Sequence, residues 1–146
     1  MKRITNYWSK WRLLSKSTKI NFLYASVTLV IIKTGLTVLP FHIFRKLFYR
    51  ISRSDKKDNL TAGEINEIVY AINTSATVLP FELLCLPRAL AAKYLLRNVP
   101  SLSLEIGIEV NANKDFEAHA WVEKNGDVII GDWSESVFYQ RLWVWE

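Results

Sequence analysis

The hydrophobic pattern of this 146-residue chain changes its period at Pro100, and this change limits the fold more than any other feature. Before Pro100, apolar residues recur every three or four positions, which is typical of helices with one buried face. After Pro100 they alternate, which is typical of a strand with one buried face, at Leu102, Leu104, Ile106, Ile108 and Val110. Glu105 and Glu109 fall on the other face of that strand. Helices followed by an antiparallel sheet predict an α+β fold.

Four helices are predicted before Pro100. Leu39-Pro40 ends the first, because the residue before a proline avoids helical geometry, and Thr61 with Glu64 has the spacing of a capping box at the start of the third. The predicted ranges are Ser15 or Ser17 to Val38, 41–52, 61–79 and 86–97.

Charge divides the chain into two parts. Residues 1–57 contain thirteen Lys or Arg and one acid, whereas residues 58–146 contain six Lys or Arg and thirteen acids. The polar segment 52–59 is the best linker candidate, so we expect a basic N-terminal helical region over 1–57 and a core domain over 58–146. Such a basic region can contact anionic lipid, nucleic acid or an acidic peptide. Alternatively, the two halves neutralise each other within the fold.

Two further strands are predicted over 117–124 and 127–132, joined by Asn125-Gly126. This dipeptide favours a tight hairpin turn, because both central residues of a type I′ turn need a positive φ. A hairpin turning at 125–126 would place residue 119 opposite about residue 132.

Cys85 is the only cysteine in the chain. Pro87 suits the first turn of a helix, so Cys85 is predicted at or near the helix N-terminus, where free backbone N–H groups stabilise a thiolate or an oxyanion. The plain alternative is a buried cysteine that fills space.

His119 favours the catalytic interpretation, because an imidazole on a strand can take the thiol proton and return it to a leaving amine. A carboxylate usually fixes such a base. The hairpin register favours Asp132 for this role, and Asp127 beside the turn is the alternative. The second histidine, His42, is expected to be packed and hydrogen-bonded. Together Cys85, His119 and Asp132 form a set suited to thiol acyl transfer.

Other kinds of site have weak support. One cysteine and two distant histidines cannot supply the four ligands of a structural zinc site, and no Gly-rich phosphate loop or nucleic-acid groove is evident. The apolar run 20–32 is shorter than a spanning helix needs, so we expect a buried core helix. The single cysteine favours a cytoplasmic setting, with association at a membrane surface left open.

Three segments together resemble the transglutaminase-like proteins of lasso-peptide biosynthesis: Cys-Leu-Pro-Arg-Ala-Leu-Ala-Ala at 85–92, the strand with Glu-Ile-Gly-Ile-Glu-Val, and Ala-His-Ala-Trp-Val-Glu within 118–132. In that family Cys-Leu-x-Arg-(Ser/Ala)-Leu marks the nucleophile, and a His-Ala-Trp-Val-Glu strand carries the base. Two Leu-Pro-Phe corners, at 39–41 and 79–81, are also similar. The resemblance implies a papain/transglutaminase-like core in which the cysteine helix packs on an antiparallel sheet.

The resemblance also implies a function. The chain would be the cysteine peptidase that removes the leader from a lasso-peptide precursor, with Cys85, His119 and Asp132 as its triad and no cofactor or metal. Trp121 would bind substrate, and Arg88 would be structural or substrate-binding. The aromatic tail over 133–146 would be core or a wall of the peptide groove.

The resemblance implies partners as well. These are the precursor peptide, a separate leader-recognition protein, since no such domain precedes residue 15, and an ATP-dependent cyclase; nucleic acid is not expected. Two alternatives stay open: an acyltransferase of the same fold that uses an amine acceptor, and a non-catalytic membrane or scaffold protein.

Overall fold

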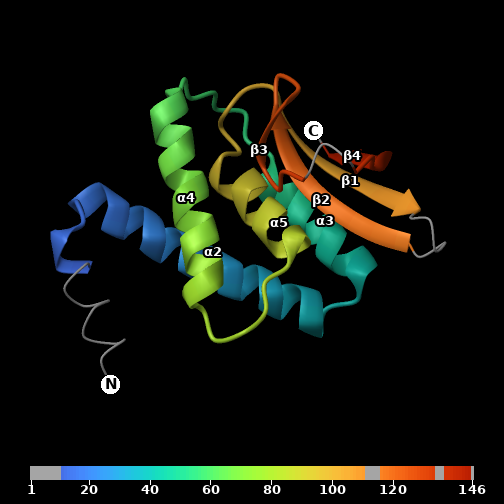
Figure 1. Cartoon of the computed structure of the whole chain (residues 1–146), viewed down its shortest axis with the longest axis horizontal. Helices are drawn as coiled ribbons and strands as arrows, with labels where there is room; N and C mark the ends of the chain where they lie inside the picture. Colours follow the sequence, from blue (N-terminus) through green and yellow to red (C-terminus); the bar gives the residue numbers. More distant parts are fainter. Residues whose placement is uncertain (1–10, 111–115, 134–136, 146) are drawn as a thin grey trace.

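The structure is a computed structural model that describes residues 11–110, 116–133 and 137–145. Its helices precede a four-stranded antiparallel sheet with the strand order β3-β2-β1-β4, which confirms the predicted α+β fold (Figure 1). The helices are α2 (Lys16–Val38), α3 (Phe41–Ser52), α4 (Ala62–Val78) and α5 (Cys85–Leu95). The strands are β1 (Leu102–Val110), β2 (Phe116–Lys124), β3 (Asp127–Ile130) and β4 (Gln140–Trp145).

The predicted helix ends are confirmed by their capping contacts. The side chain of Ser15 accepts a hydrogen bond from the backbone N–H of Thr18 and caps α2. Thr61 and Glu64 form the capping box at the start of α4. Leu39 and Leu79, each before a proline, are extended and end α2 and α4. Local sequence therefore sets where these helices begin and end.

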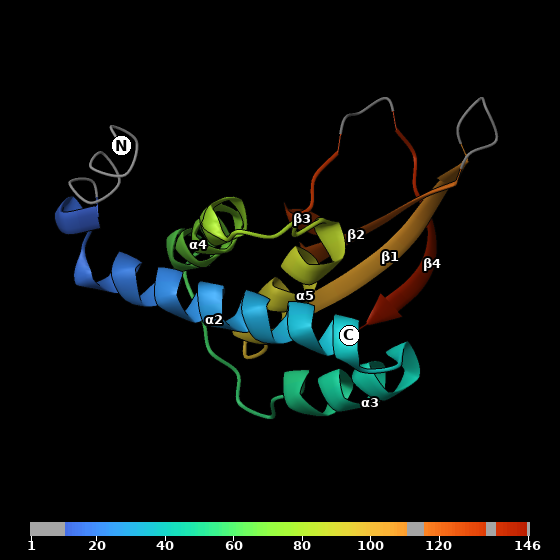
Figure 2. The same ribbon diagram turned by 90° about the horizontal axis from the view of Figure 1, so that it is seen from below.

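Helix α5 lies at the centre of the molecule. It packs against β2 and β1 on one side and against α2 and α4 on the other (Figure 2). The largest aliphatic side chains of the core are fully buried and come from every layer: Leu29, Ile72, Leu90, Leu96, Leu104 and Val122. The basic N-terminal part and the remainder of the chain thus share one hydrophobic core.

The expectation of a buried core helix over 20–32 holds for only one face of α2. Ala25, Thr28, Leu29 and Ile32 are buried, whereas Leu23, Tyr24 and Ile31 on the outer side are exposed. Among the described residues, α2 is the one helix whose length and composition would let it cross a membrane, a property that core helices and N-terminal signal sequences share.

The hairpin between β2 and β3 forms as predicted but pairs over a shorter length. Asn125 and Gly126 both have positive φ angles, 54° and 89°, as a type I′ turn requires. β3 ends at Ile130 rather than 132, because Gly131 turns the chain with a φ of 84°. A register shift between Val122 and Glu123 also changes the pairing beyond the turn.

Strand β4 was not predicted as a strand. It comes from the aromatic tail, runs antiparallel to β1 and forms one edge of the sheet. Of its side chains only Trp145 is buried, where it packs on Phe48 of α3 with ring centroids 5.3 Å apart. The tail therefore contributes both to the core and to the surface.

Candidate active site

Cys85 is the first residue of α5, one position earlier than the predicted helix start. The preceding residue, Leu84, is the N-cap and makes no side-chain capping hydrogen bond, so no side chain occupies the N-cap acceptor position at this end of the helix. The thiol is free and half-buried, and it packs at the margin of the core. This is an environment in which backbone N–H groups can stabilise a thiolate.

Arg88 lies one turn into the same helix. Its Nε atom donates a hydrogen bond to the carbonyl oxygen of Leu83 over 2.9 Å. This contact ties the helix to the loop that leads into it. Of the two roles left open for Arg88, the structural one therefore has a contact to support it.

His119 lies on β2 opposite Gly107 of β1. Its Nε2 atom donates a hydrogen bond to the carbonyl oxygen of Gly131 over 2.5 Å. Because a carbonyl oxygen only accepts, the neutral ring carries its hydrogen on Nε2 and its lone pair on Nδ1. The His119 ring therefore keeps one nitrogen that can act as a base. His42, expected to be packed, is instead exposed on α3.

Three aromatic side chains surround the imidazole of His119. The ring centroid of Tyr139 lies 4.9 Å away in a stacked arrangement, that of Trp133 lies 5.7 Å away edge-on, and that of Trp121 lies 6.0 Å away. Gly107 leaves room for them, since a Cβ atom there would come within 2.9 Å of the Trp121 ring and 3.0 Å of the Tyr139 Cβ. We call these four side chains, including His119, the aromatic cluster.

Trp121 is part of this cluster and not of an open surface. It is only 1% exposed, and its ring packs edge-on against Trp133 with centroids 4.7 Å apart. A residue so buried supports the histidine beside it more readily than it contacts a peptide. Trp133 and Tyr139 were not predicted from the sequence as site residues. The high density of aromatic residues in the tail over 133–146 was the signal that could have indicated them.

The structure relates Cys85 to His119 through Tyr139. The pKa of the Tyr139 phenol is raised, first by its burial and then by the electrostatic effects of Glu117, Glu109 and Cys85. The cysteine therefore lies within electrostatic reach of the ring that stacks on His119. Within the described residues no hydrogen bond joins the Cys85 sulfur to His119, and such contacts are often long before substrate binds.

The alternation of side chains along β2 explains why Cys85 and His119 are not hydrogen-bonded to each other. Ala120 and Val122 face the core beneath α5, and His119 and Trp121 alternate with them toward the other face of the sheet. The imidazole of His119 thus points to the face of β2 turned away from the helical core, and it has to reorient to meet the Cys85 sulfur.

Asp132 and Asp127 are both exposed. In the described part of the chain, neither carboxylate accepts a hydrogen bond from His119; the backbone of Gly131 does so instead. The predicted pairing of residue 119 with about 132 does not occur, since the last pair of the hairpin is Val122 with Ile130. The register shift and the early end of β3 account for the difference.

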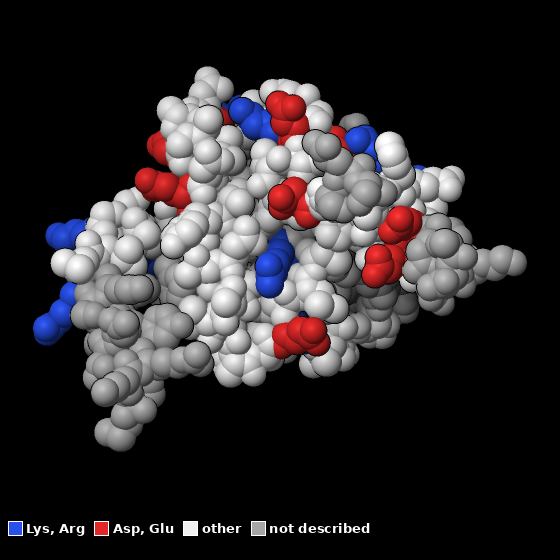
Figure 3. Space-filling model, in the orientation of Figure 1, with Lys and Arg blue, Asp and Glu red and all other residues white. Residues whose placement is uncertain are grey.

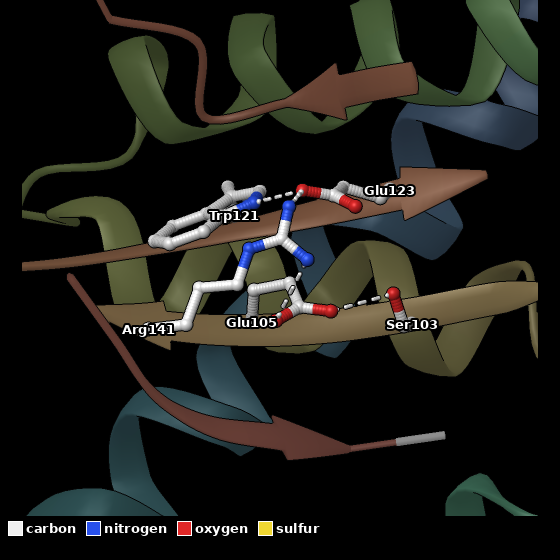
Figure 4. Close-up of polar contacts among 5 residues, drawn as sticks. All are labelled: Ser103, Glu105, Trp121, Glu123 and Arg141. Atoms are coloured by element: carbon white, nitrogen blue, oxygen red, sulfur yellow. Dashed lines mark hydrogen bonds and ion pairs between the residues drawn. The ribbon is translucent and has the colours of Figure 1, made fainter. Parts of the chain in front are cut away.

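A buried polar network lies beside the aromatic cluster, on the face of the sheet turned away from the helices (Figure 4). Glu123 accepts hydrogen bonds from the Trp121 indole over 2.8 Å and from Arg141 over 2.7 Å. Arg141 also lies 3.8 Å from Glu105, whose other carboxylate oxygen accepts from Ser103. Glu105 was expected on the exposed face of its strand, but the Arg141 side chain and its neighbours cover it.

The described residues give no sign of a metal centre, because they contain no group of three or more His, Cys, Asp or Glu side chains arranged to hold an ion. Charged side chains form small separate groups on a largely uncharged surface in the view of Figure 3. The described residues on the face seen there form no broad basic area of the kind that nucleic-acid binding requires.

Comparison with known proteins agrees with this arrangement. The family model described as transglutaminase-like superfamily matches residues 27–144. No curated protein and no solved structure matches the chain. Proteins of this superfamily generally use cysteine-based catalysis, commonly as proteases or acyltransferases. Since the match covers most of the chain and includes α5 and all of the sheet except Trp145, the protein belongs to the transglutaminase-like superfamily.

Proposed function

We propose that the chain is a cysteine peptidase that removes the leader from a lasso-peptide precursor. One observation carries the chemistry. The only cysteine of the chain opens a helix with no capping side chain. That helix packs on the strand of a histidine whose Nδ1 is left as a base. The leader-removing specificity rests on the sequence resemblance.

In the proposed mechanism, His119 Nδ1 takes the proton of the Cys85 thiol, and the thiolate attacks the carbonyl carbon of the bond between leader and core. The backbone N–H groups at the start of α5 stabilise the oxyanion. The C–N bond then breaks, and the proton on His119 passes to the departing amine of the core. The leader remains as a thioester on Cys85 until a water, deprotonated by His119, releases it as a carboxylic acid.

This mechanism requires the sulfur and the imidazole to approach each other when the peptide binds. Gly131, Trp133 and Tyr139 provide the carbonyl and ring contacts that hold His119. A small displacement of these three residues would change the orientation of the ring. Asp132, which directly follows Gly131, is proposed to stabilise the imidazolium by its charge once that displacement has occurred.

The partners and location follow from the same proposal. The chain would act on the precursor together with a separate leader-recognition protein and pass the core to an ATP-dependent cyclase. It would work in the cytoplasm, and the exposed apolar side of α2 would allow contact with a membrane surface.

The test uses the two histidines as a matched pair. A lasso-peptide precursor is incubated with the chain and a leader-recognition protein, and the masses of the products are measured by mass spectrometry. We expect His119→Ala to slow release of a free leader by at least about 100-fold and His42→Ala to leave it unchanged. Equal rates for the two variants would contradict the proposal. A cross-linked product in place of a free leader would show an acyltransferase instead.

A further inference from the structure

β4 is an edge strand whose outer side is open. It pairs with β1 alone in the described part of the chain. Leu142, Trp143 and Val144 are 60%, 38% and 45% exposed, respectively. An edge strand presents unpaired backbone N–H and C=O groups, which are a template for pairing with another extended chain.

A groove of about 490 Å³ lies between this strand and α3. Its lining residues are Arg45, Lys46 and Tyr49 of α3 and Trp143, Val144 and Trp145 of β4. Consecutive strand residues point to opposite faces of a sheet. Because Trp143, Val144 and Trp145 all line the groove, the groove runs along the edge of β4 rather than over one face of the sheet. Figure 2 shows the end of β4 directed toward α3, and the Phe48–Trp145 contact joins the two elements.

The groove has aromatic walls and positive charge. The Tyr49 ring stacks on Trp145 with centroids 6.4 Å apart, and the Arg45 guanidinium lies 4.3 Å from the centroid of the Trp143 ring. Among the residues that the structure describes, no acidic side chain lines the groove. Within the described residues, Arg45 and Lys46 form no ion pair. A guanidinium held against a ring presents its N–H groups to a carboxylate in a fixed orientation.

The edge strand also leads to the candidate active site. Tyr139, which stacks on His119, directly precedes β4. Trp143 is four residues farther along the chain, about 13 Å at the rise of an extended strand. A peptide paired along β4 would therefore have one part in the groove and another beside the aromatic cluster.

We infer that the groove between α3 and β4 binds an extended, acidic segment of the peptide substrate, which adds to the sheet as a strand beside β4. Its carboxylate binds Arg45 and Lys46 about four to six residues from the bond that is cut, since Trp143 to Trp145 lie at that separation from Tyr139. This inference rests on the proposed function, because it names the feature of the substrate that the site recognises.

Binding is tested with the Cys85→Ala chain, so that the result does not depend on the proposed chemistry. The probes are two fluorescein-labelled peptides of alternating Thr and Val, one with a central Glu and one with Gln in its place, followed by fluorescence anisotropy. We expect the Glu peptide to bind at least about fivefold more tightly. Arg45→Glu should weaken its binding by at least about tenfold.

Arg50→Glu is the matched control, because Arg50 is an exposed arginine of the same helix that does not line the groove. It should change binding by less than about twofold. Equal binding of both peptides, equal effects of both charge reversals, or no binding up to about 1 mM would overturn the inference. So would a dimer in sedimentation that Arg45→Glu dissociates, since a second copy would then occupy the groove.

Discussion

The Nε2 atom of His119 donates its hydrogen bond to the backbone carbonyl of Gly131, 2.5 Å away. The orientation of this imidazole therefore depends on the path of the chain at Gly131, and among the described residues no carboxylate side chain holds it. Gly131 can follow that path because it has a φ of 84°, a conformation that costs a residue with a side chain about 1–2 kcal/mol. The glycine and the histidine thus form one structural unit.

We expect Gly131→Ala to lower both stability and leader removal. A Cβ atom at this position would lie 2.7 Å from the carbonyl oxygen of Ala120 and 3.0 Å from the Trp121 Cα, so the backbone has to move. The free energy of unfolding in urea should fall by at least about 2 kcal/mol. The turnover rate should fall by about tenfold or more because His119 loses its alignment.

Gly126→Ala is the matched control for this variant. Gly126 also has a positive φ, 89°, but a Cβ atom there would contact nothing within 4 Å. It should cost about 1 kcal/mol of stability and leave the rate unchanged. Equal losses of activity in the two variants would show that strain alone, and not the His119 contact, is responsible.

Tyr139 is expected to act through its ring. The ring stacks on His119 with centroids 4.9 Å apart, so Tyr139→Phe should keep most of the activity and Tyr139→Ala should lower kcat by about tenfold to 100-fold. Steady-state kinetics on the precursor separate the two variants. If Tyr139→Phe loses as much kcat as Tyr139→Ala, the hydroxyl and not the stacked ring is the important group.

Arg141 is expected to stabilise the sheet by compensating two buried carboxylates. Its own side chain is 55% exposed, so Arg141→Leu should lower the free energy of unfolding by about 1–3 kcal/mol rather than by the larger amounts seen for fully buried pairs. Adding Glu105→Gln should recover part of this loss, because one oxygen of Glu105 has no hydrogen-bond partner in the described residues. A double-mutant cycle in urea measures the coupling, and strictly additive effects would contradict it.

The capping box of α4 should make stability depend on pH. Hydrogen bonds from the backbone and then the side chain of Thr61 lower the pKa of Glu64 below its ordinary value. A group with a lowered folded pKa stabilises the protein above its unfolded pKa and loses this effect as pH falls through the folded value. The urea midpoint of Glu64→Gln should therefore be below that of the parent near pH ~6 and approach it near pH ~2.

Glu67→Gln serves as the control for this measurement, since Glu67 is exposed on the same helix and outside the capping box. Its midpoint should follow that of the parent across the whole range. A difference for Glu64→Gln that does not change with pH would rule out the ionised capping box as the cause.

Much of the helical part could be predicted because its signals are local. The Ser15 cap, the Thr61 capping box and the two Leu-Pro ends each depend on residues within one turn of one another. The same holds for the Asn125-Gly126 turn, where the need for positive φ is intrinsic to the residues. Such features do not depend on what the rest of the chain does.

The candidate site was harder to predict, because it depends on pairing between distant segments. A one-residue register shift in the hairpin, together with the turn at Gly131, replaced the Asp132 carboxylate by a backbone carbonyl. The burial of Glu105 depends on Arg141, which only the pairing of β4 with β1 brings near. No local pattern in the aromatic tail indicated that pairing.

The most direct test of the proposed mechanism is to trap the thioester on Cys85. The chain is mixed with the precursor and the leader-recognition protein and quenched in acid within the first turnover, and the intact protein is weighed. We expect an added mass equal to the leader less one water, located on the peptide that contains Cys85, and neither adduct nor cleavage with Cys85→Ala. Undiminished leader removal by Cys85→Ala would contradict the mechanism.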